Sequence, residues 1–570
     1  MEIMRTEKSS RRCFLAVGGA VVVVAALFLY SCGNSHKRAE ADLVNFIMRY
    51  EREMVPLVEK INHIGWKFAE TGSLRYLNRL DSLRSLQIDY LHDAKSFAYL
   101  EKIRVKEDIK DVYLRRQADI LYRRYRPCQG SVQVQKQLMR LDIWLHLQTW
   151  KRLRMRYIEK NIENLPHSSV EESRMLQKEW EIWKDGGHTV ADSLLKMIRL
   201  RNDLAREAGY ADYFAMRLDL DEIRASFIDS LLSDLKQATD AVYRQKKLEK
   251  DHFLAESFSI PLSRLRPWHY RGSFLRYGEY PVNQRKDSYY SYINIPDMVE
   301  RFYSGIGFDL EDVLARSNLL HWGDKLPVFE CLLAGDKNDI RIIGTISGTE
   351  NDMYRLMGAA GKAIYLKYIP GTFPTLLRRP SSESVLCGVS AFFSRMTHYP
   401  AWILSMGILS VGQAGEIRGT TDEEFLRNQR LGCRWRLFLY NFEKQMYADP
   451  DRDLDSLWHA LTREYFLLDI QPEQEREAEW AAEPYFVLAS CQVANHLLGE
   501  LWAAQVTDYL CRIDCRLKEP CDFNSVGNES VGKFFEKQVF APGASLNWEE
   551  LTEAATGEPL SLKAFVEQFK

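Results

Sequence analysis

Metal-ion chemistry is the first possibility to test, because the chain contains twelve histidines and ten cysteines. Two histidines four residues apart on a helix lie on one face and can share a zinc ion. No two histidines here have that spacing, and neither His-Glu-x-x-His nor Cys-x-x-Cys occurs. A site assembled from His321, His398, His496 and Cys387 is conceivable, but without local spacing these are better interpreted as ordinary surface or core residues.

Covalent catalysis is not indicated either. Residues 388–391 read Gly-Val-Ser-Ala and lack the second glycine of a nucleophile elbow. Cys387 would need a nearby histidine base to act as a nucleophile, and it is more simply interpreted as a small packing residue. Residues 344–348 are no phosphate loop, because the ending Gly-Lys-Ser/Thr is missing.

The elements that would position reactive side chains are mostly helices. Residues 42–260 carry apolar side chains at helical spacing and few prolines. At about 326–347, two apolar or β-branched runs flank a turn rich in Gly, Asn and Asp, which predicts a β-hairpin. A helix is predicted at about 352–369. We expect a mostly α fold with one small antiparallel sheet beside this central helix.

Several segments, taken in order, resemble those of helical zinc peptidases. They are Arg201-Asn202 with Gly209-Tyr210; Pro267-Trp268-His269-Tyr270; Arg316-Ser317-Asn318-Leu319 with the hairpin; Phe442-Glu443-Lys444-Gln445-Met446-Tyr447; and Asn495-His496-Leu497-Leu498-Gly499-Glu500-Leu501. The likeness runs from about residue 40 to 520 and is nearest to the bacterial relatives of angiotensin-converting enzyme, among the gluzincin peptidases. It implies a two-lobed helical fold around a central cleft.

The resemblance places the zinc motif at residues 358–362, where the motif is missing. Gly358 and Lys362 stand in place of the two histidines, and Ala359 stands in place of the general base. Glycine has no ligand atom, a lysine ammonium repels a cation, and alanine cannot activate water.

The other catalytic positions that the resemblance implies are changed as well. The third zinc ligand, a glutamate in the family, falls at Cys387. The oxyanion-binding histidine falls at Tyr485, and the tyrosine positions fall at Gln492 and His496. One ligand cannot hold a site that needs three. We therefore expect no zinc cofactor and no peptidase activity.

The N-terminus predicts a bacterial lipoprotein signal. Basic residues precede an apolar run from Phe14 to Tyr30, which ends in Leu29-Tyr30-Ser31-Cys32. Residues 1–31 would be removed, Cys32 would carry lipid, residues 32–41 would form a tether, and residues 42–570 would form the helical domain. An uncleaved anchor helix is the alternative, although a bilayer span needs about 20 apolar residues. We expect a lipid-anchored envelope protein that faces the periplasm or exterior of a gram-negative bacterium.

The functional expectation combines these observations. A net charge of -2 gives no general attraction to nucleic acid. We expect a membrane-anchored pseudopeptidase that binds peptides or an envelope protein by strand addition along residues 340–346, with Lys362, Arg341 and Ile343 as candidate contacts. Two alternatives stay open. One is an active zinc metallopeptidase of peptidyl-dipeptidase or oligopeptidase type with an unusual site, and the other is a structural subunit of an envelope assembly.

Overall fold

The computed structural model describes residues 3–105, 108–159, 170–270, 288–320, 325, 329–468, 477–512 and 523–569; within these ranges the side chains of 3–35, 154–159, 170, 414 and 416–425 are not described. The described chain is mostly helical with one two-stranded antiparallel sheet, so the mostly α prediction is confirmed. It divides into two compact units, Met1–Leu57 with Tyr90–Gln129 and Val58–Asp89 with Gly130–Lys570.

The helices and strands labelled α and β are, in chain order, α1 (Ile3–Thr71), α2 (Leu74–Leu91), α3 (Ala94–Val105), α4 (Val112–Tyr125), α5 (Val132–Glu159), α6 (Val170–Asp185), α7 (Ala191–Glu207), α8 (Tyr213–Leu220), α9 (Ala225–Ser257), α11 (Ile295–Gly305), α12 (Glu311–Arg316), β1 (Glu330–Leu333), β2 (Ile340–Ile343), α13 (Glu350–Tyr368), α14 (Glu383–Met396), α15 (Pro400–Ser405), α16 (Val411–Ala448), α17 (Leu454–Phe466), α18 (Tyr485–Leu488), α19 (Val493–Leu510), α20 (Glu529–Phe534), α21 (Trp548–Thr556) and α22 (Lys563–Glu567).

Aromatic side chains hold the first unit together. The ring of Phe46 in α1 lies 5.1 Å from that of Tyr99 in α3 and 6.3 Å from that of Tyr125 in α4. Phe97 in α3 stacks on Tyr122 in α4 at 5.5 Å. Such ring pairs stabilise beyond the area they bury, so a three-helix unit of this size has a core of its own.

The backbone of α1 is helical through residues 32–41, where we expected a tether. The stretch contains no proline, the residue that ends helices most effectively. The side chain of Cys32 and the signal segment before it lie outside the described side chains. Among the residues whose side chains are described, no helix is both long and apolar enough to cross a membrane.

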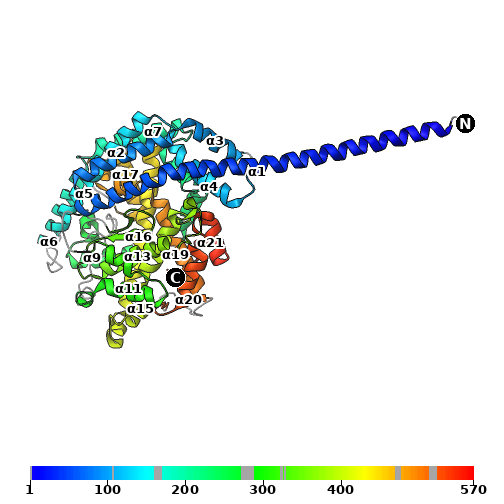
Figure 1. Cartoon of the computed structure of the whole chain (residues 1–570). Coiled ribbons are helices and arrows are strands. Elements are labelled where there is room, and N and C mark those ends of the chain that lie inside the picture. Colours follow the sequence, from blue (N-terminus) through cyan, green and yellow to red (C-terminus); the bar gives the residue numbers. More distant parts are fainter. Residues whose placement is uncertain are drawn as a thin grey trace. The chain divides into compact units, whose positions relative to one another are not determined.

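Three helices pack together in the second unit, where α14 contacts both α13 and α19. Of the three, α13 and α19 are labelled in Figure 1. Glycines set how closely they approach. A Cβ atom on Gly499 of α19 would lie 2.8 Å from the backbone nitrogen of Gly388 and 2.8 Å from Cβ of Cys387, both in α14. A Cβ on Gly358 of α13 would lie 2.7 Å from Oγ of Ser390 in α14. No side chain fits at these crossings unless the neighbour moves.

The predicted hairpin is present, with Glu330 opposite Ile343 and Leu333 opposite Ile340. Residues 317–319 lie along the other edge of β2. The N–H of Asn318 donates to the carbonyl of Ile342 (2.9 Å), and the N–H of Gly344 donates to the carbonyl of Asn318 (3.0 Å). β2 is therefore paired on both edges, and the edge that we expected to receive a peptide is occupied by the chain itself.

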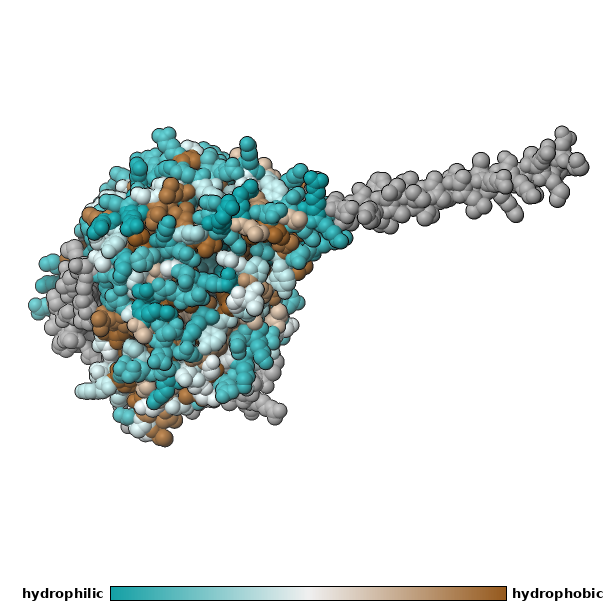
Figure 2. Space-filling model, in the orientation of Figure 1, coloured by the Kyte–Doolittle hydropathy of each residue, from teal (hydrophilic) through white to brown (hydrophobic). Residues whose placement is uncertain are grey.

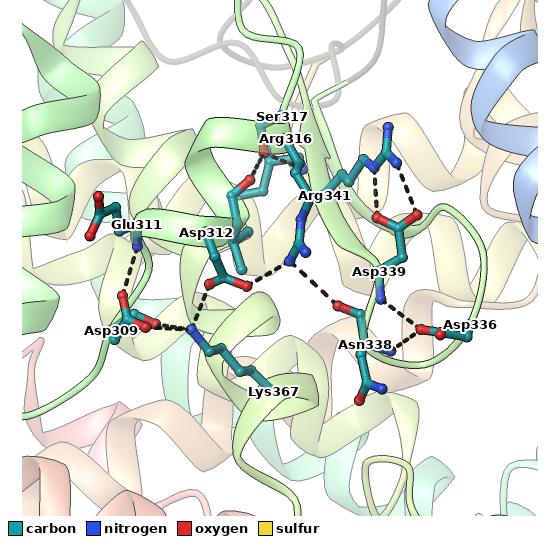
Figure 3. Close-up of polar contacts among 12 residues, drawn as sticks. Asp309, Glu311, Asp312, Arg316, Ser317, Asp336, Asn338, Asp339, Arg341 and Lys367 are labelled. Carbon is teal, nitrogen blue, oxygen red and sulfur yellow. Dashed lines mark hydrogen bonds and ion pairs between the residues drawn. The ribbon is translucent and has the colours of Figure 1, made fainter.

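Ion pairs hold α12, which leads into residues 317–319, in place (Figure 3). Asp312 of α12 accepts from Lys367 of α13 and from Arg316, each at 2.6 Å. Arg316 also reaches the carbonyl of Asn338 in the hairpin turn (3.5 Å). Ser317, which follows, accepts the N–H of Ile342 on its Oγ (2.8 Å). Arg316 at the end of α12 thus contacts the turn, and Ser317, the next residue, contacts the covered edge.

A buried polar network joins α7, α16 and the turn before α19. Arg201 donates to the hydroxyls of Tyr447 (2.8 Å) and Ser490 (2.9 Å). Oε1 of Glu443 accepts from Ser490 Oγ (2.9 Å) and from the N–H of Cys491 (2.8 Å). Burial raises the pKa of Glu443 to about 7, although these donors and Arg201 oppose it. Residues from separate segments of the resemblance, Arg201 and Glu443-to-Tyr447, meet here.

The close crossing of α14 and α19 at Gly499 predicts what adding one methyl group there does to stability. Gly499→Ala should destabilise the protein by about 1–3 kcal/mol, because α14 must move away from the new Cβ. The gain in helix propensity, about 1 kcal/mol, offsets part of this loss. Gly412, in the first turn of α16, has nothing within 4 Å of its Cβ position and supplies the control. Gly412→Ala should leave the urea midpoint unchanged or raise it; equal midpoints for Gly499→Ala and wild type would contradict the close crossing.

Glu443 predicts a pH-dependent loss of stability. The unfolded chain releases this proton near pH 4.5 and the folded protein near pH 7, so stability falls as pH rises through that window, by roughly 3 kcal/mol at most. Glu443→Gln lacks the ionisation, and its urea midpoint should exceed that of wild type at pH 8 but not at pH 5.

The buried Glu479 provides a control of opposite sign. Burial would raise its pKa, but Lys184 (2.6 Å) and His459 outweigh that effect and the pKa is lowered. Its contribution to stability is therefore present above the unfolded pKa and lost as pH falls. Glu479→Gln should accordingly destabilise the protein at pH 8. If the urea midpoints of wild type and Glu443→Gln change with pH in the same way, the loss of stability between about pH 4.5 and 7 does not come from Glu443.

Candidate functional site

The candidate site is built around Lys362 of α13, one helical turn after Gly358. Thr349 and Asp352 form a capping box that starts this helix. Nζ of Lys362 lies 2.7 Å from Oε1 of Glu330, the first residue of β1. The two side chains are 19% and 44% exposed, so water screens the pair and it contributes about 1 kcal/mol or less.

The charge state of Lys362 excludes two kinds of chemistry. Burial alone would lower its pKa, but Glu330, Cys387 and Glu383 outweigh that effect and the pKa is raised above its ordinary value. The side chain is therefore an ammonium at physiological pH. An ammonium has no lone pair, so it can neither attack a carbonyl nor bind a metal ion.

Glu383 and Cys387 stand four residues apart on α14, with Sγ 3.7 Å from Oε1. Glu383 is exposed, yet burial among surrounding atoms is the main cause that raises its pKa, against the effect of Lys362. Burial, and then Glu383, raise the pKa of the Cys387 thiol. A protonated thiol is a poor nucleophile and a poor zinc ligand.

Residues at the start of α19 lie within electrostatic reach of Lys362. Burial, and then the cations Arg436 and Lys362, lower the pKa of His496 to about 3, so its imidazole is neutral. Asn495 donates to Oε1 of Gln492 and to Oδ2 of Asp221, both at 2.9 Å. Asp221 in turn helps to raise the pKa of Glu383. Gln492, one of the changed oxyanion positions, is thus linked to the site through Asp221.

The other changed positions have different surroundings. Tyr485 is 1% exposed, its ring lies 5.9 Å from that of Phe486, and its N–H donates to Glu483 (3.2 Å). Ala359 is 6% exposed, and the position of Gly358 is filled by α14. The structure therefore brings together Lys362, Cys387 and, through Asp221, Gln492, whereas Tyr485 belongs to the aromatic packing around α18.

The peptide candidates on β2 have other partners. Arg341 pairs with Asp339 at 2.7 Å, and its guanidinium lies 5.2 Å from the ring centre of Trp66. The side chain of Ile343 is fully buried, in a small cluster that includes Trp66 and Ala334. The side chains of both residues thus serve the packing of the hairpin.

Sequence reasoning missed Glu330 and Glu383. Glu383 stands four residues before Cys387, so helical spacing alone would have placed it on the same face. Glu330 has no such local signal, because its contact with Lys362 joins a strand and a helix 32 residues apart. What results is one ammonium beside two carboxylates, an arrangement that can bind polar groups but contains no activated nucleophile and no vacant ligand set.

Zinc binding gives a direct test of the site. Among the described residues, no group of three or more His, Cys, Asp or Glu side chains could hold a metal ion. We expect the purified full chain in detergent, after dialysis against zinc, to retain almost no zinc by mass spectrometry. The reason is that the positively charged ammonium of Lys362 stands where the resemblance places a zinc ligand. One tightly held zinc ion that is lost in Cys387→Ala would overturn this expectation.

Comparison with known proteins adds no family assignment: no protein-family model matches the chain, and no curated protein matches its sequence.

Proposed function

We propose that this chain is a membrane-anchored, extracytoplasmic pseudopeptidase with the two-lobed fold of the helical zinc peptidases, and that it binds peptides without cleaving them. In this proposal residues 1–31 are a lipoprotein signal, Cys32 carries the lipid, and the protein faces the periplasm or exterior of a gram-negative cell. The ligand could also be an envelope protein, which would bind through an extended peptide segment.

The ion pair between Lys362 and Glu330 is the observation that carries the proposal. The resemblance assigns Lys362 to a metal-ligand position, and there the ammonium supplies a fixed positive charge beside the carboxylates of Glu330 and Glu383. At the other ligand position, α14 packs against Gly358. A site closed in this way argues against hydrolysis, which would require a bound metal and a general base.

The outer edge of β1 supplies a place for the peptide. Ala334 donates to the carbonyl of Asp339 (2.8 Å), which marks a hydrogen-bonded pair of the ladder. Because such pairs alternate along antiparallel strands, the backbone groups of Leu332 and Glu330 face β2, whereas those of Cys331 and Leu333 face away. Within the described residues, no hydrogen bond uses these outward groups. A peptide strand added there would lie next to Glu330 and its partner Lys362.

Proline substitution tests this edge. Proline lacks an N–H, and a strand tolerates it where that N–H points away from its neighbour. Leu333→Pro should keep the hairpin yet weaken binding of short unstructured peptides about tenfold, as expected for about 1.4 kcal/mol. Binding is measured by fluorescence anisotropy with the full chain in detergent. Leu333→Ala, which keeps the N–H and removes the side chain, is the matched control and should bind like wild type.

The same samples separate the possible outcomes. Equal binding by Leu333→Pro and wild type would rule out the β1 edge. Unchanged binding by Lys362→Glu would show that the ammonium does not contribute to peptide binding. It would refute the part of the proposal that rests on the Lys362–Glu330 ion pair and would leave only the β1 edge. Hydrolysis of the peptides that a chelator abolishes would restore a peptidase function and refute the proposal as a whole.

A further inference from the structure

Exposed apolar side chains gather where α3 ends and α4 begins, in the first unit. Val105 is 86% exposed, Val112 is 65% exposed and Tyr113 is 47% exposed. Residues 106 and 107 lie outside the described residues. Single exposed apolar residues are common on protein surfaces, and Figure 2 shows small separate hydrophobic groups among hydrophilic ones. Exposure alone therefore does not identify a contact surface at these three residues.

Hydrogen bonds tie this tip to His36 and Glu40, which are among the first residues of α1 whose side chains are described. Nδ1 of His36 lies 2.9 Å from the carbonyl oxygen of Asp108. Oε1 of Glu40 accepts the backbone N–H groups of Lys110 (2.9 Å) and Asp111 (3.1 Å). Asp111 also caps α4 by accepting the N–H of Leu114 (2.9 Å). The tip is thus held against residues 36–40 by contacts from both segments.

The tie places the tip close to the proposed point of lipid attachment. A helix rises 1.5 Å per residue, so residues 36–40 stand about 6 to 12 Å from Cys32 along α1. The polar headgroup layer of one leaflet is roughly 5–8 Å thick. If α1 runs along the membrane normal, a protein anchored at Cys32 holds residues 108–111, and with them the neighbouring Val112 and Tyr113, about as far from Cys32 as the headgroup layer is thick.

The charges around the tip have mixed signs. Lys37, Arg38, Lys102 and Lys110 are exposed, and so are the acids Asp42, Glu101 and Asp111. Arg104 pairs with Asp119 at 2.9 Å. Attraction to anionic lipid is therefore weak, and any contact with a membrane depends on the apolar side chains. Valine and tyrosine suit that role, because tyrosine places its ring in apolar surroundings and its hydroxyl in water.

We infer that the α3–α4 tip, Val105 with Asp108–Tyr113, rests in the lipid surface beside the anchor and so fixes the orientation of the first unit on the membrane. The inference rests on the proposed attachment at Cys32. With a second contact next to the lipid, the unit cannot turn freely about its anchor.

A fluorescent probe at the tip tests the inference. The full chain is reconstituted into phosphatidylcholine–phosphatidylglycerol vesicles with an environment-sensitive nitrobenzoxadiazole label on Val112→Cys. The control is Lys95→Cys, an exposed position in the same unit at the other end of α3, about 15 Å from Val105. Labelling of the unsubstituted protein gives the background from its native cysteines. The label at 112 should shift to shorter emission wavelength and be quenched by lipids that carry a nitroxide near the headgroup, whereas the label at 95 should show neither effect.

The outcomes separate the inference from the proposal beneath it. Protein that stays in the aqueous fraction overturns the anchor, and the inference with it. Anchored protein whose labels at 112 and 95 behave alike overturns the inference alone. A wavelength shift at 112 that grows with protein concentration, without quenching by nitroxide lipid, indicates contact with a second copy of the chain and also overturns it.

Discussion

The close contact between α13 and α14 is the constraint on which the site depends. Gly358 lies so near Ser390 that a side chain at this position would force the two helices apart. Lys362 stands one turn later on the same helix. The packing that excludes a side chain at position 358 therefore also fixes where the side chain of Lys362 starts, and from there it reaches Glu330 of β1. The crossing of α14 with α19 at Gly388 and Gly499 repeats this principle and brings His496 within electrostatic reach of Lys362.

The charges around Lys362 balance one another. Two carboxylates next to each other would raise each other's pKa, and Glu330 does raise the pKa of Glu383. The ammonium of Lys362 offsets that repulsion, because it pairs with Glu330 and acts to lower the pKa of Glu383. The neutral imidazole of His496 adds no further positive charge. Lys362 thereby supplies a positive charge. Unlike a metal ion, its ammonium group cannot coordinate a water molecule and activate it for attack.

The hairpin and the helix at its end could be predicted from sequence, because both depend on local patterns. Predicted limits of about 326–347 and 352–369 compare with strands at Glu330–Leu333 and Ile340–Ile343 and a helix at Glu350–Tyr368. What lay beside them could not be predicted. Residues 317–319 pair with β2 through hydrogen bonds that cross more than twenty residues, and Glu330 reaches Lys362 across 32. Hydrophobic periodicity contains no information on such pairings.

In the proposed function, the two edges of the sheet would decide what kind of ligand the site recognises. On the covered edge, Ser317 and Asn318 already satisfy the backbone of β2. On the outer edge of β1, an added strand would gain backbone hydrogen bonds that every peptide sequence can form. Lys362 adds little selection by charge, because a ligand carboxylate would have to compete with Glu330, already 2.7 Å away. In the proposed function, recognition at such an edge would therefore depend on an extended backbone and on side chains at alternate positions, and it would discriminate peptides by shape more than by charge.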